Sequence, residues 1–250
     1  MERLGLRDDQ WDRVKDILPG REGHVGGTAS DNRLFVEAIV YRVRTGVPWR
    51  DLPERFGKWK SVHQRFSRWA KSGVFDGIFK LLASDADTEY MMIDASIVRA
   101  HQHSAGARKE NGPQAIGRSR GGLTTKIHAL VDALGNPANL ILTAGQTHDL
   151  ACADGLIENV DPGAILADKG YDADSLIEKL QRRGITPVIP PKANRTIKRA
   201  CDFVLYCERN LIERFFNKIK HFRAIATRYD KLDKNFLAAL QLVSVIILLN

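Results

Sequence analysis

Hydrophobic positions in the first part of the chain recur with the three- to four-residue spacing of amphipathic helices. This spacing predicts helices over Leu4–Leu18, Asp31–Arg44 and Trp49–Phe56. A glycine-rich stretch at residues 20–27 separates the first two helices and is typical of a linker. We therefore expect a small all-α domain over residues 1–84.

A further helix follows Gly57 and carries a DNA-binding signal. Ser61 resembles the start of a capping box, and Val62, Phe66 and Trp69 lie at i, i+4 and i+7 on one face. The opposite face is basic and presents Arg65, Arg68 and Lys71. A short helix, a glycine turn and a basic second helix form a helix-turn-helix arrangement, whose second helix enters a DNA groove. The alternative interpretation is a surface helix with a solvated basic face.

From Tyr90 onward, short apolar runs alternate with amphipathic segments. The runs predict strands over Tyr90–Ala95, Thr125–Asp132, Ala138–Thr143, Ala164–Ala167 and Thr186–Ile189. The amphipathic segments predict helices over His148–Asn159, Asp172–Arg183 and about Cys207–Phe222. This order predicts an α/β fold over residues 85–250, with a mixed sheet flanked by helices.

The charge distribution favours a polyanionic partner. The chain holds 38 basic and 30 acidic residues, a net charge of +8. Residues 42–71 contain nine Lys or Arg against two acids, and residues 99–126 contain six against one. Residues 147–180 are the reverse, with eight acids and two bases. The pattern predicts a DNA-facing surface around a metal-binding pocket, although any single basic run can also be a solvated helix face.

Composition also excludes some classes of protein. The three cysteines, Cys152, Cys201 and Cys207, form no C-x-x-C pair, which indicates reduced thiols in a cytoplasmic protein. The longest apolar run, Phe236–Leu249, has 14 residues, whereas a helix that spans a membrane needs about 20. We expect a core helix or a dimer surface there, and no membrane association.

Three carboxylates stand at positions suited to one site. Asp94 ends the first predicted strand and Asp168 follows the fourth, while Glu213 lies on the last helix of the sheet domain. Arg209 and Lys220 share the helix stripe of Glu213. Taken singly, each aspartate could be a turn residue or a helix cap, and Arg209 and Glu213 could be an i, i+4 surface pair.

Clustered carboxylates repel one another unless they are protonated or bind cations. Three of them supply the hard oxygen ligands that suit Mg²⁺ or Mn²⁺. Two such ions about 4 Å apart activate an attacking oxygen and stabilise the leaving oxygen of a phosphodiester. Nearby Lys and Arg side chains would position the phosphates. Asp172, which precedes the next helix, is better interpreted as its N-cap.

Several sequence blocks resemble one family. Tyr206-x2-Arg209-x3-Glu213-x6-Lys220 fits the signature Y-x2-R-x3-E-x6-K at all four positions. The segments that begin at Asp94, Gly117 and Ala167, together with the N-terminal segment Trp49–Pro53, are also similar to blocks of this family. On these residues the chain resembles the bacterial insertion-sequence transposases of the DDE class, insertion-sequence-5 type.

The resemblance implies an RNase H-like catalytic domain in which Asp94, Asp168 and Glu213 are the catalytic acids and bind two Mg²⁺ or Mn²⁺ ions. It implies cleavage at the ends of an insertion element and transfer of the freed 3′ hydroxyl to target DNA. The partner would be DNA at the nucleoid, held by a homo-oligomer that joins two element ends. The residues expected to contact DNA are Arg65, Arg68, Arg118, Arg120, Tyr206, Arg209 and Lys220.

Two other functions remain open from the residues. A metal-dependent nuclease of the same fold would use the same acids without strand transfer. A non-catalytic regulator would use only the N-terminal helices. His101 and His103 could bind a transition metal, but no third ligand stands at zinc spacing, so a DNA contact or a loop hydrogen bond is the preferred interpretation.

Overall fold

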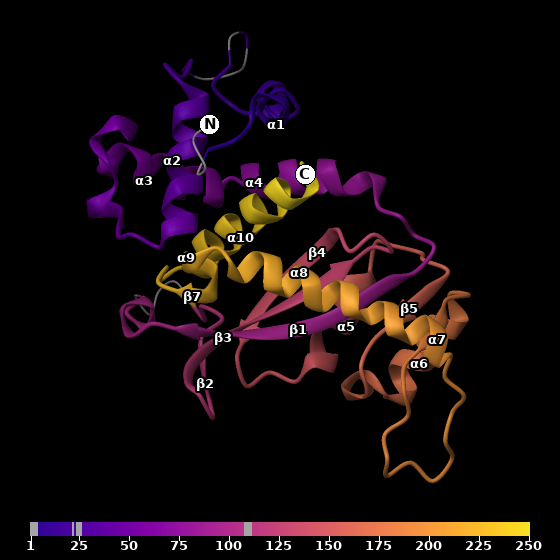
Figure 1. The fold of residues 1–250 in the computed structure, drawn as a ribbon. Helices are drawn as coiled ribbons and strands as arrows, with labels where there is room; N and C mark the ends of the chain where they lie inside the picture. The colour runs from indigo at the N-terminus through magenta and orange to yellow at the C-terminus, as the bar shows by residue number, and fades with distance from the viewer. Residues whose placement is uncertain (1–4, 22, 24–26, 108–111) are drawn as a thin grey trace. The chain divides into compact units, whose positions relative to one another are not determined.

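The computed structural model describes residues 5–21, 23, 27–107 and 112–250 (Figure 1). Parts of the predicted linker at 20–27 and of the loop at 101–122 lie outside these residues. The chain forms two compact units. The first contains residues 1–82, 100–114 and 219–250, and the second contains residues 83–99 and 115–218.

The first unit is helical, as the sequence predicts. Its helices are α1 (Asp8–Asp12), α2 (Asn32–Thr45), α3 (Trp59–Lys71), α4 (Val74–Leu82), α9 (Arg223–Ala226) and α10 (Asp233–Leu248). The amphipathic segment at 4–18 is not one helix, because α1 ends at Asp12 and a separate 3-10 turn covers Lys15–Ile17.

Helix α3 buries the predicted face but begins earlier than expected. Val62, Phe66 and Trp69 are buried. The helix starts at Trp59, and its N-cap residue, Lys58, makes no side-chain capping bond, so the predicted capping box at Ser61 is wrong. The preceding short helix is a pair of 3-10 turns, Trp49–Asp51 and Glu54–Phe56.

Helix α10 forms the centre of the first unit. It contacts α2, α3, α4 and α9, and most of its side chains are buried. Its buried Gln241 donates a hydrogen bond to Asp76 at 2.9 Å, which satisfies a polar group in the core. The apolar run at 236–249 is therefore a core helix. Within the described ranges, no helix has the length and apolar character needed to cross a bilayer.

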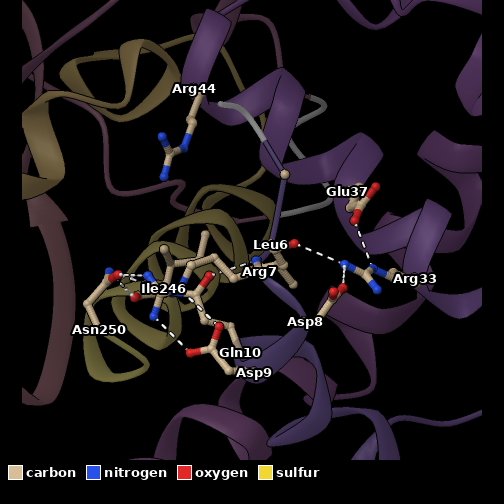
Figure 2. A pocket seen from close by; sticks show the side chains of 11 residues that line it. Leu6, Arg7, Asp8, Asp9, Gln10, Arg33, Glu37, Arg44, Ile246 and Asn250 are labelled. Carbon is tan, nitrogen blue, oxygen red and sulfur yellow. Dashed lines mark hydrogen bonds and ion pairs between the residues drawn. The ribbon is translucent and has the colours of Figure 1, made fainter. Parts of the chain in front are cut away.

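Helix α1 and the residue before it are held to Asn250, just past the end of α10 (Figure 2). Arg7 and Gln10 donate to the side-chain oxygen of Asn250 at 2.9 and 3.1 Å. Arg33 on α2 forms ion pairs with Asp8 and Glu37 at 2.6 and 3.0 Å. These contacts order a short segment that has few helical residues of its own.

The second unit is built on a mixed sheet. Its strands are β1 (Met91–Ala100), β2 (Gly117–Ser119), β3 (Gly122–Val131), β4 (Pro137–Ala144), β5 (Ala164–Leu166) and β6 (Thr186–Val188). The order is β2-β3-β1-β5-β6, and β4 also pairs with β3. β1 is antiparallel to β3 and parallel to β5, and β5 is parallel to β6. The predicted sheet is confirmed, but its first strand runs to residue 100 instead of 95.

Helices cover both faces of this sheet. Helices α5 (Ala153–Ile157) and α6 (Asp174–Arg182) contribute Leu156, Leu176 and Leu180 to a core shared with Met91 and Ile93. The predicted long helix at 207–222 is instead a series of three elements. These are α7 (Phe203–Tyr206), the 3-10 turn Cys207–Arg209 and α8 (Asn210–Lys220).

Asp172 is an electrostatic anchor for the segment after β6. The prediction that it caps α6 is wrong, since α6 begins at Asp174 and Ala173 is the N-cap. Asp172 accepts from Arg195 at 2.6 Å, from Arg199 at 2.9 Å and from the backbone N–H of Lys192 at 2.8 Å. Burial alone would raise the pKa of Asp172, but these hydrogen bonds and charges hold its pKa below the ordinary value.

Replacing Asp172 by alanine should lower the free energy of unfolding by about 2–3 kcal/mol, because two arginines lose a buried partner. Asp174 pairs with the same two arginines but is exposed, so Asp174→Ala should cost less than about 1 kcal/mol. Urea unfolding of the two variants measures the difference. Equal losses would contradict the anchoring role.

The pH dependence of the unfolding midpoint should also differ between the parent chain and Asp172→Ala. The lowered pKa of Asp172 contributes stability above the pKa of an unfolded aspartate, and this contribution is lost as the pH falls through the folded value. Unfolding midpoints measured between neutral and acidic pH should therefore fall less steeply for Asp172→Ala than for the parent chain. If the midpoints of the two proteins fell in parallel as the pH is lowered, ionisation of Asp172 would not contribute to the stability of the fold.

Candidate active site

Two of the three predicted acids meet because of strand register. β1 and β5 are parallel, with Met91 opposite Ile165 and Met92 opposite Leu166. The same register, continued by two residues, places Asp94 beside Asp168. β5 ends at Leu166, so Asp168 lies just past the carboxyl end of its strand, where sites of α/β proteins gather.

The environment of Asp94 works against its ionised form. Burial raises the pKa of Asp94, and the charge of Asp168 raises it further. The backbone N–H of Ala95, which donates at 2.8 Å, and the guanidinium of Arg209 oppose this rise in pKa. A positively charged partner therefore strongly affects whether the carboxyl group of Asp94 is ionised.

Asp168 is held by the turn that follows it. Its side chain accepts from the backbone N–H of Gly170 at 2.8 Å and caps the 3-10 turn Lys169–Tyr171. A Cβ at position 170 would lie 2.8 Å from the Asp168 oxygen, which is closer than real Cβ contacts. Glycine is thus required at position 170 for this close approach. The turn-cap interpretation of Asp168 is correct, and it positions the carboxylate beside Asp94.

Arg209 connects the third acid to the first. Its Nη1 lies 2.7 Å from Asp94 Oδ2, and its Nη2 lies 2.6 Å from Glu213 Oε1. Burial lowers the pKa of Arg209, but the charges of Asp94 and Glu213 more than compensate, so its pKa is raised. The expected i, i+4 ion pair between Arg209 and Glu213 is present. Arg209 also donates to Asp94 on β1, which is 115 residues earlier in the sequence.

The arrangement bears on the predicted metal ions. Within the part of the chain that the structure describes, no three Asp, Glu, His or Cys side chains are grouped closely enough to hold a metal ion. Arg209 supplies the positive charge between Asp94 and Glu213 instead. The donor chemistry still fits a divalent cation, because the carboxylates offer hard oxygens and the charge of Asp168 is close enough to act on Asp94.

Tyr171, three residues after Asp168, has no role in the sequence interpretation. It is fully buried in the core that contains Met91 and Ile93, and its hydroxyl has no hydrogen-bond partner among the described residues. Burial raises the pKa of Tyr171, and the charges of Asp149, Asp94 and Asp168 raise it further, so the phenol stays protonated.

A second polar group lies on the other face of the sheet. Lys126 and His128 are opposite Ile97 and Ala95 in the register, so they point away from the face of Asp94. Buried Lys126 donates to Asp149 at 2.6 Å, and burial lowers the pKa of His128 to about 4. Lys126 is thus a satisfied structural group, whereas His128 pairs only through Nε2, with Thr143 Oγ1 at 2.8 Å, and its buried Nδ1 has no partner among the described residues.

The predicted DNA contacts differ in exposure. Arg118, Arg120 and Arg68 are exposed. Arg65 is half-buried, with its guanidinium over the rings of Phe35 and Trp69 at 4.1 and 4.8 Å. Tyr206 lies below Arg209, with 5.8 Å between ring centre and guanidinium, and so borders the acids. Lys220 is half-buried at the end of α8.

Comparison with known proteins decides the family. The model described as "Transposase DDE domain" matches residues 86–248, well over half of the chain. The chain belongs to the DDE transposases. A second model, "Putative transposase of IS4/5 family", matches residues 6–79.

The chain is also similar to several individual proteins. An "Uncharacterized protein y4sN" of Sinorhizobium fredii is 49% identical over 112 residues, which are 45% of this chain and 90% of that protein. The "Putative transposase for insertion sequence element IS6501" of Brucella ovis is 36% identical over 127 residues, 50% of this chain and 98% of that one. A piggyBac transposase in a synaptic complex with hairpin DNA is 15% identical, with a TM-score of 0.44. That match covers 75% of this chain and 48% of the other.

DDE transposases cleave and join DNA with divalent metal ions, and this chain is an enzyme of that class. The mixed α/β sheet is the RNase H-like fold that the resemblance implies. The transposase assignment also explains why basic segments accompany an acidic centre, since phosphate binding and metal binding occur in the same enzyme.

Removing Arg209 should make the acidic centre a better cation site. In Arg209→Ala the guanidinium no longer competes for Asp94 and Glu213, so the affinity for Ca²⁺, measured by calorimetry without DNA, should rise about tenfold, or about 1.4 kcal/mol. Arg214→Ala, which removes an exposed arginine from the same helix, is the control. An unchanged or weaker affinity in Arg209→Ala alone would contradict the competition.

Proposed function

We propose that this transposase binds the terminal inverted repeats of an insertion element, hydrolyses DNA at the element ends and joins each freed 3′ hydroxyl to target DNA. The observation that supports the proposal is the link among Asp94, Arg209 and Glu213, with Asp168 just past the end of the strand that pairs with β1. All four residues belong to the signature or to its two partner blocks, and all four lie in the second unit.

Asp94, Asp168 and Glu213 would hold two Mg²⁺ or Mn²⁺ ions. When bound, such ions activate the attacking oxygen and stabilise the leaving oxygen of the phosphodiester. The role of this chain is to fix the three carboxylates: Gly170 positions Asp168, the Ala95 N–H positions Asp94, and α8 carries Glu213.

In this proposal Arg209 pairs first with the acids and then with a DNA phosphate. It neutralises Asp94 and Glu213 in the metal-free chain, and it is free to turn to a DNA phosphate once cations hold the carboxylates. A guanidinium forms bidentate bonds with either carboxylate or phosphate, so the exchange preserves its hydrogen bonds. Tyr206 and Lys220, which are seven residues before and seven residues after Glu213, would contact the same strand.

DNA end recognition is assigned to residues 1–84 and catalysis to residues 85–250. Exposed Arg68 on α3 would contact the element end, while exposed Arg118 and Arg120 would contact DNA near the acids. Because two ends must be joined to one target, the active form would be a homo-oligomer at the bacterial nucleoid.

A nuclease without strand transfer is the competing function. Both reactions use the same acids, so only the fate of the 3′ hydroxyl separates them. With pre-cleaved element ends and a supercoiled target plasmid, the proposed function yields covalently joined products. Hydrolysed ends without joined products would favour the nuclease.

Asp94→Asn, Asp168→Asn or Glu213→Gln should lower the rate of end cleavage by about 1000-fold or more, because each loses a charged ligand worth several kcal/mol in the transition state. Cleavage of a labelled element end in Mg²⁺ measures the rate, and fluorescence anisotropy measures DNA binding, which should stay within about threefold. Glu208→Gln removes an exposed acid close to the same helix and is the control. Binding losses as large as the rate losses would contradict the catalytic assignment.

Arg68→Ala should weaken binding to the element end and reduce the slope of log affinity against log salt by about 1, because one phosphate contact is lost. Arg13→Ala removes another exposed arginine and should leave the slope unchanged. Arg65→Ala is unsuitable, since its guanidinium packs on two core rings. An unchanged slope in Arg68→Ala would remove α3 from the DNA interface.

A further inference from the structure

A buried lysine of the second unit lies on the face of the sheet opposite Asp94. Lys126 on β3 is 9% exposed, and its ammonium donates to Asp149 Oδ1 and to the backbone oxygen of Thr147, both at 2.6 Å. Lysine is almost never buried without a partner, because removing an ammonium group from water is costly. The two contacts therefore fix the segment that follows β4 onto the sheet.

The same segment approaches β3 closely at Gly145. A Cβ at position 145 would overlap the side chain of Thr124, with only 2.7 Å to the Thr124 Cβ. Glycine is thus required at this position, and its backbone N–H donates to the backbone oxygen of Thr124 at 3.2 Å. The chain leaves β4, passes Gly145 in contact with β3 and then reaches the two acceptors of Lys126.

The anchored segment leads to the acidic centre through two short turns. It continues into the 3-10 turn Asp149–Cys152. This turn packs against the 3-10 turn Lys169–Tyr171, which is the turn that Asp168 caps. After burial, the charge of Asp149 is the strongest influence that raises the pKa of Tyr171, so the two side chains lie close to each other. Lys126 is therefore connected to Asp168 through Asp149 and Tyr171.

Tyr171 fixes the turn of Asp168 from the face of the sheet opposite Asp94. It shares a core with Ile93 and Leu130, which are paired in the sheet and alternate with Asp94. Tyr171 is fully buried, and its hydroxyl has no hydrogen-bond partner among the described residues. Packing therefore holds the ring in place, and a shift of the neighbouring turn would move it.

We infer that Lys126 is a positioning residue for the acidic centre. It holds Asp149 and the turn that begins there against Tyr171, and this packing keeps the carboxylate of Asp168 in place beside Asp94. Residues that support metal ligands from outside contribute strongly to metal affinity. The inference rests on the proposed function, since it assigns Lys126 to the proposed divalent-cation site.

The test measures the affinity of the full chain for Ca²⁺ by calorimetry without DNA. Lys126→Met removes a positive charge, which by charge alone would make the acids bind a cation more tightly. The positioning role predicts the opposite result, an affinity about tenfold weaker, as for other residues that support metal ligands. Lys179→Met is the control, because it breaks an exposed ion pair with Asp154 in the same unit and should leave the affinity unchanged.

Circular dichroism at the temperature of the titration shows whether Lys126→Met is folded. A merely structural role of Lys126 would lower the unfolding midpoint of the variant and leave the Ca²⁺ affinity of the folded chain unchanged. Unchanged or tighter Ca²⁺ binding by folded Lys126→Met would therefore overturn the inference.

A second pair of variants tests the same role if Lys126→Met does not fold. Asp149→Asn and Asp149→Ala remove the same charge, but only asparagine keeps a side-chain oxygen that accepts from Lys126. The side chain of Asp149 is 34% exposed, so neither change opens a deeply buried cavity. Asp149→Ala should bind Ca²⁺ about fivefold more weakly than Asp149→Asn. Equal affinities of these two variants would show an effect of charge alone and would overturn the inference.

The parent chain separates this inference from the proposed function. If the parent chain does not bind Ca²⁺, the divalent-cation site of the proposed function is itself overturned. If the parent chain binds Ca²⁺ and all the variants bind it with the same affinity, only the positioning role of Lys126 is overturned.

Discussion

Electrostatic repulsion between Asp94 and Asp168 is the constraint around which the second unit is organised. The parallel pairing of β1 and β5 forces the two carboxylates toward each other, because backbone hydrogen bonds fix the register independently of the side chains. Two adjacent carboxylates favour protonation of one of them unless positive charge is close. Burial is the main cause of the raised pKa of Asp94, and the charge of Asp168 adds to it. The fold must therefore supply cations at this position.

Arg209 supplies the charge in the metal-free chain. Its guanidinium joins Asp94 to Glu213, so the same contact that relieves repulsion also fixes α8 on the face of the sheet that carries Asp94. Divalent ions would take over the neutralisation in the working enzyme and release a guanidinium for phosphate. A site that needs positive charge in both states explains why the arginine and the glutamate stand four residues apart on one helix.

The sequence predicts many of the strands and helices around the acids, because these depend on the pattern of neighbouring residues. Apolar runs identified the strands on which Asp94 and Asp168 lie, and helical spacing identified the buried face of α3. The errors occur where side chains compete for several partners. Asp172 has the sequence position of a helix cap, yet it accepts hydrogen bonds from Arg195 and Arg199. Both arginines lie in a loop more than twenty residues later in the chain. The contact between Arg209 and Asp94, the unpaired hydroxyl of Tyr171 and the ion pair between Lys126 and Asp149 all depend on segments that only the tertiary fold brings together.

The central claim is that three distant acids together bind a pair of divalent cations. Fe²⁺ can replace these ions, and with ascorbate and peroxide it generates radicals that cut the backbone near the place where it is bound. Mass spectrometry of the full chain treated in this way should find cuts in three segments, around residues 94, 168 and 213, and Mg²⁺ should suppress them together. Cuts confined to a single segment, or cuts that Mg²⁺ does not suppress, would contradict the account.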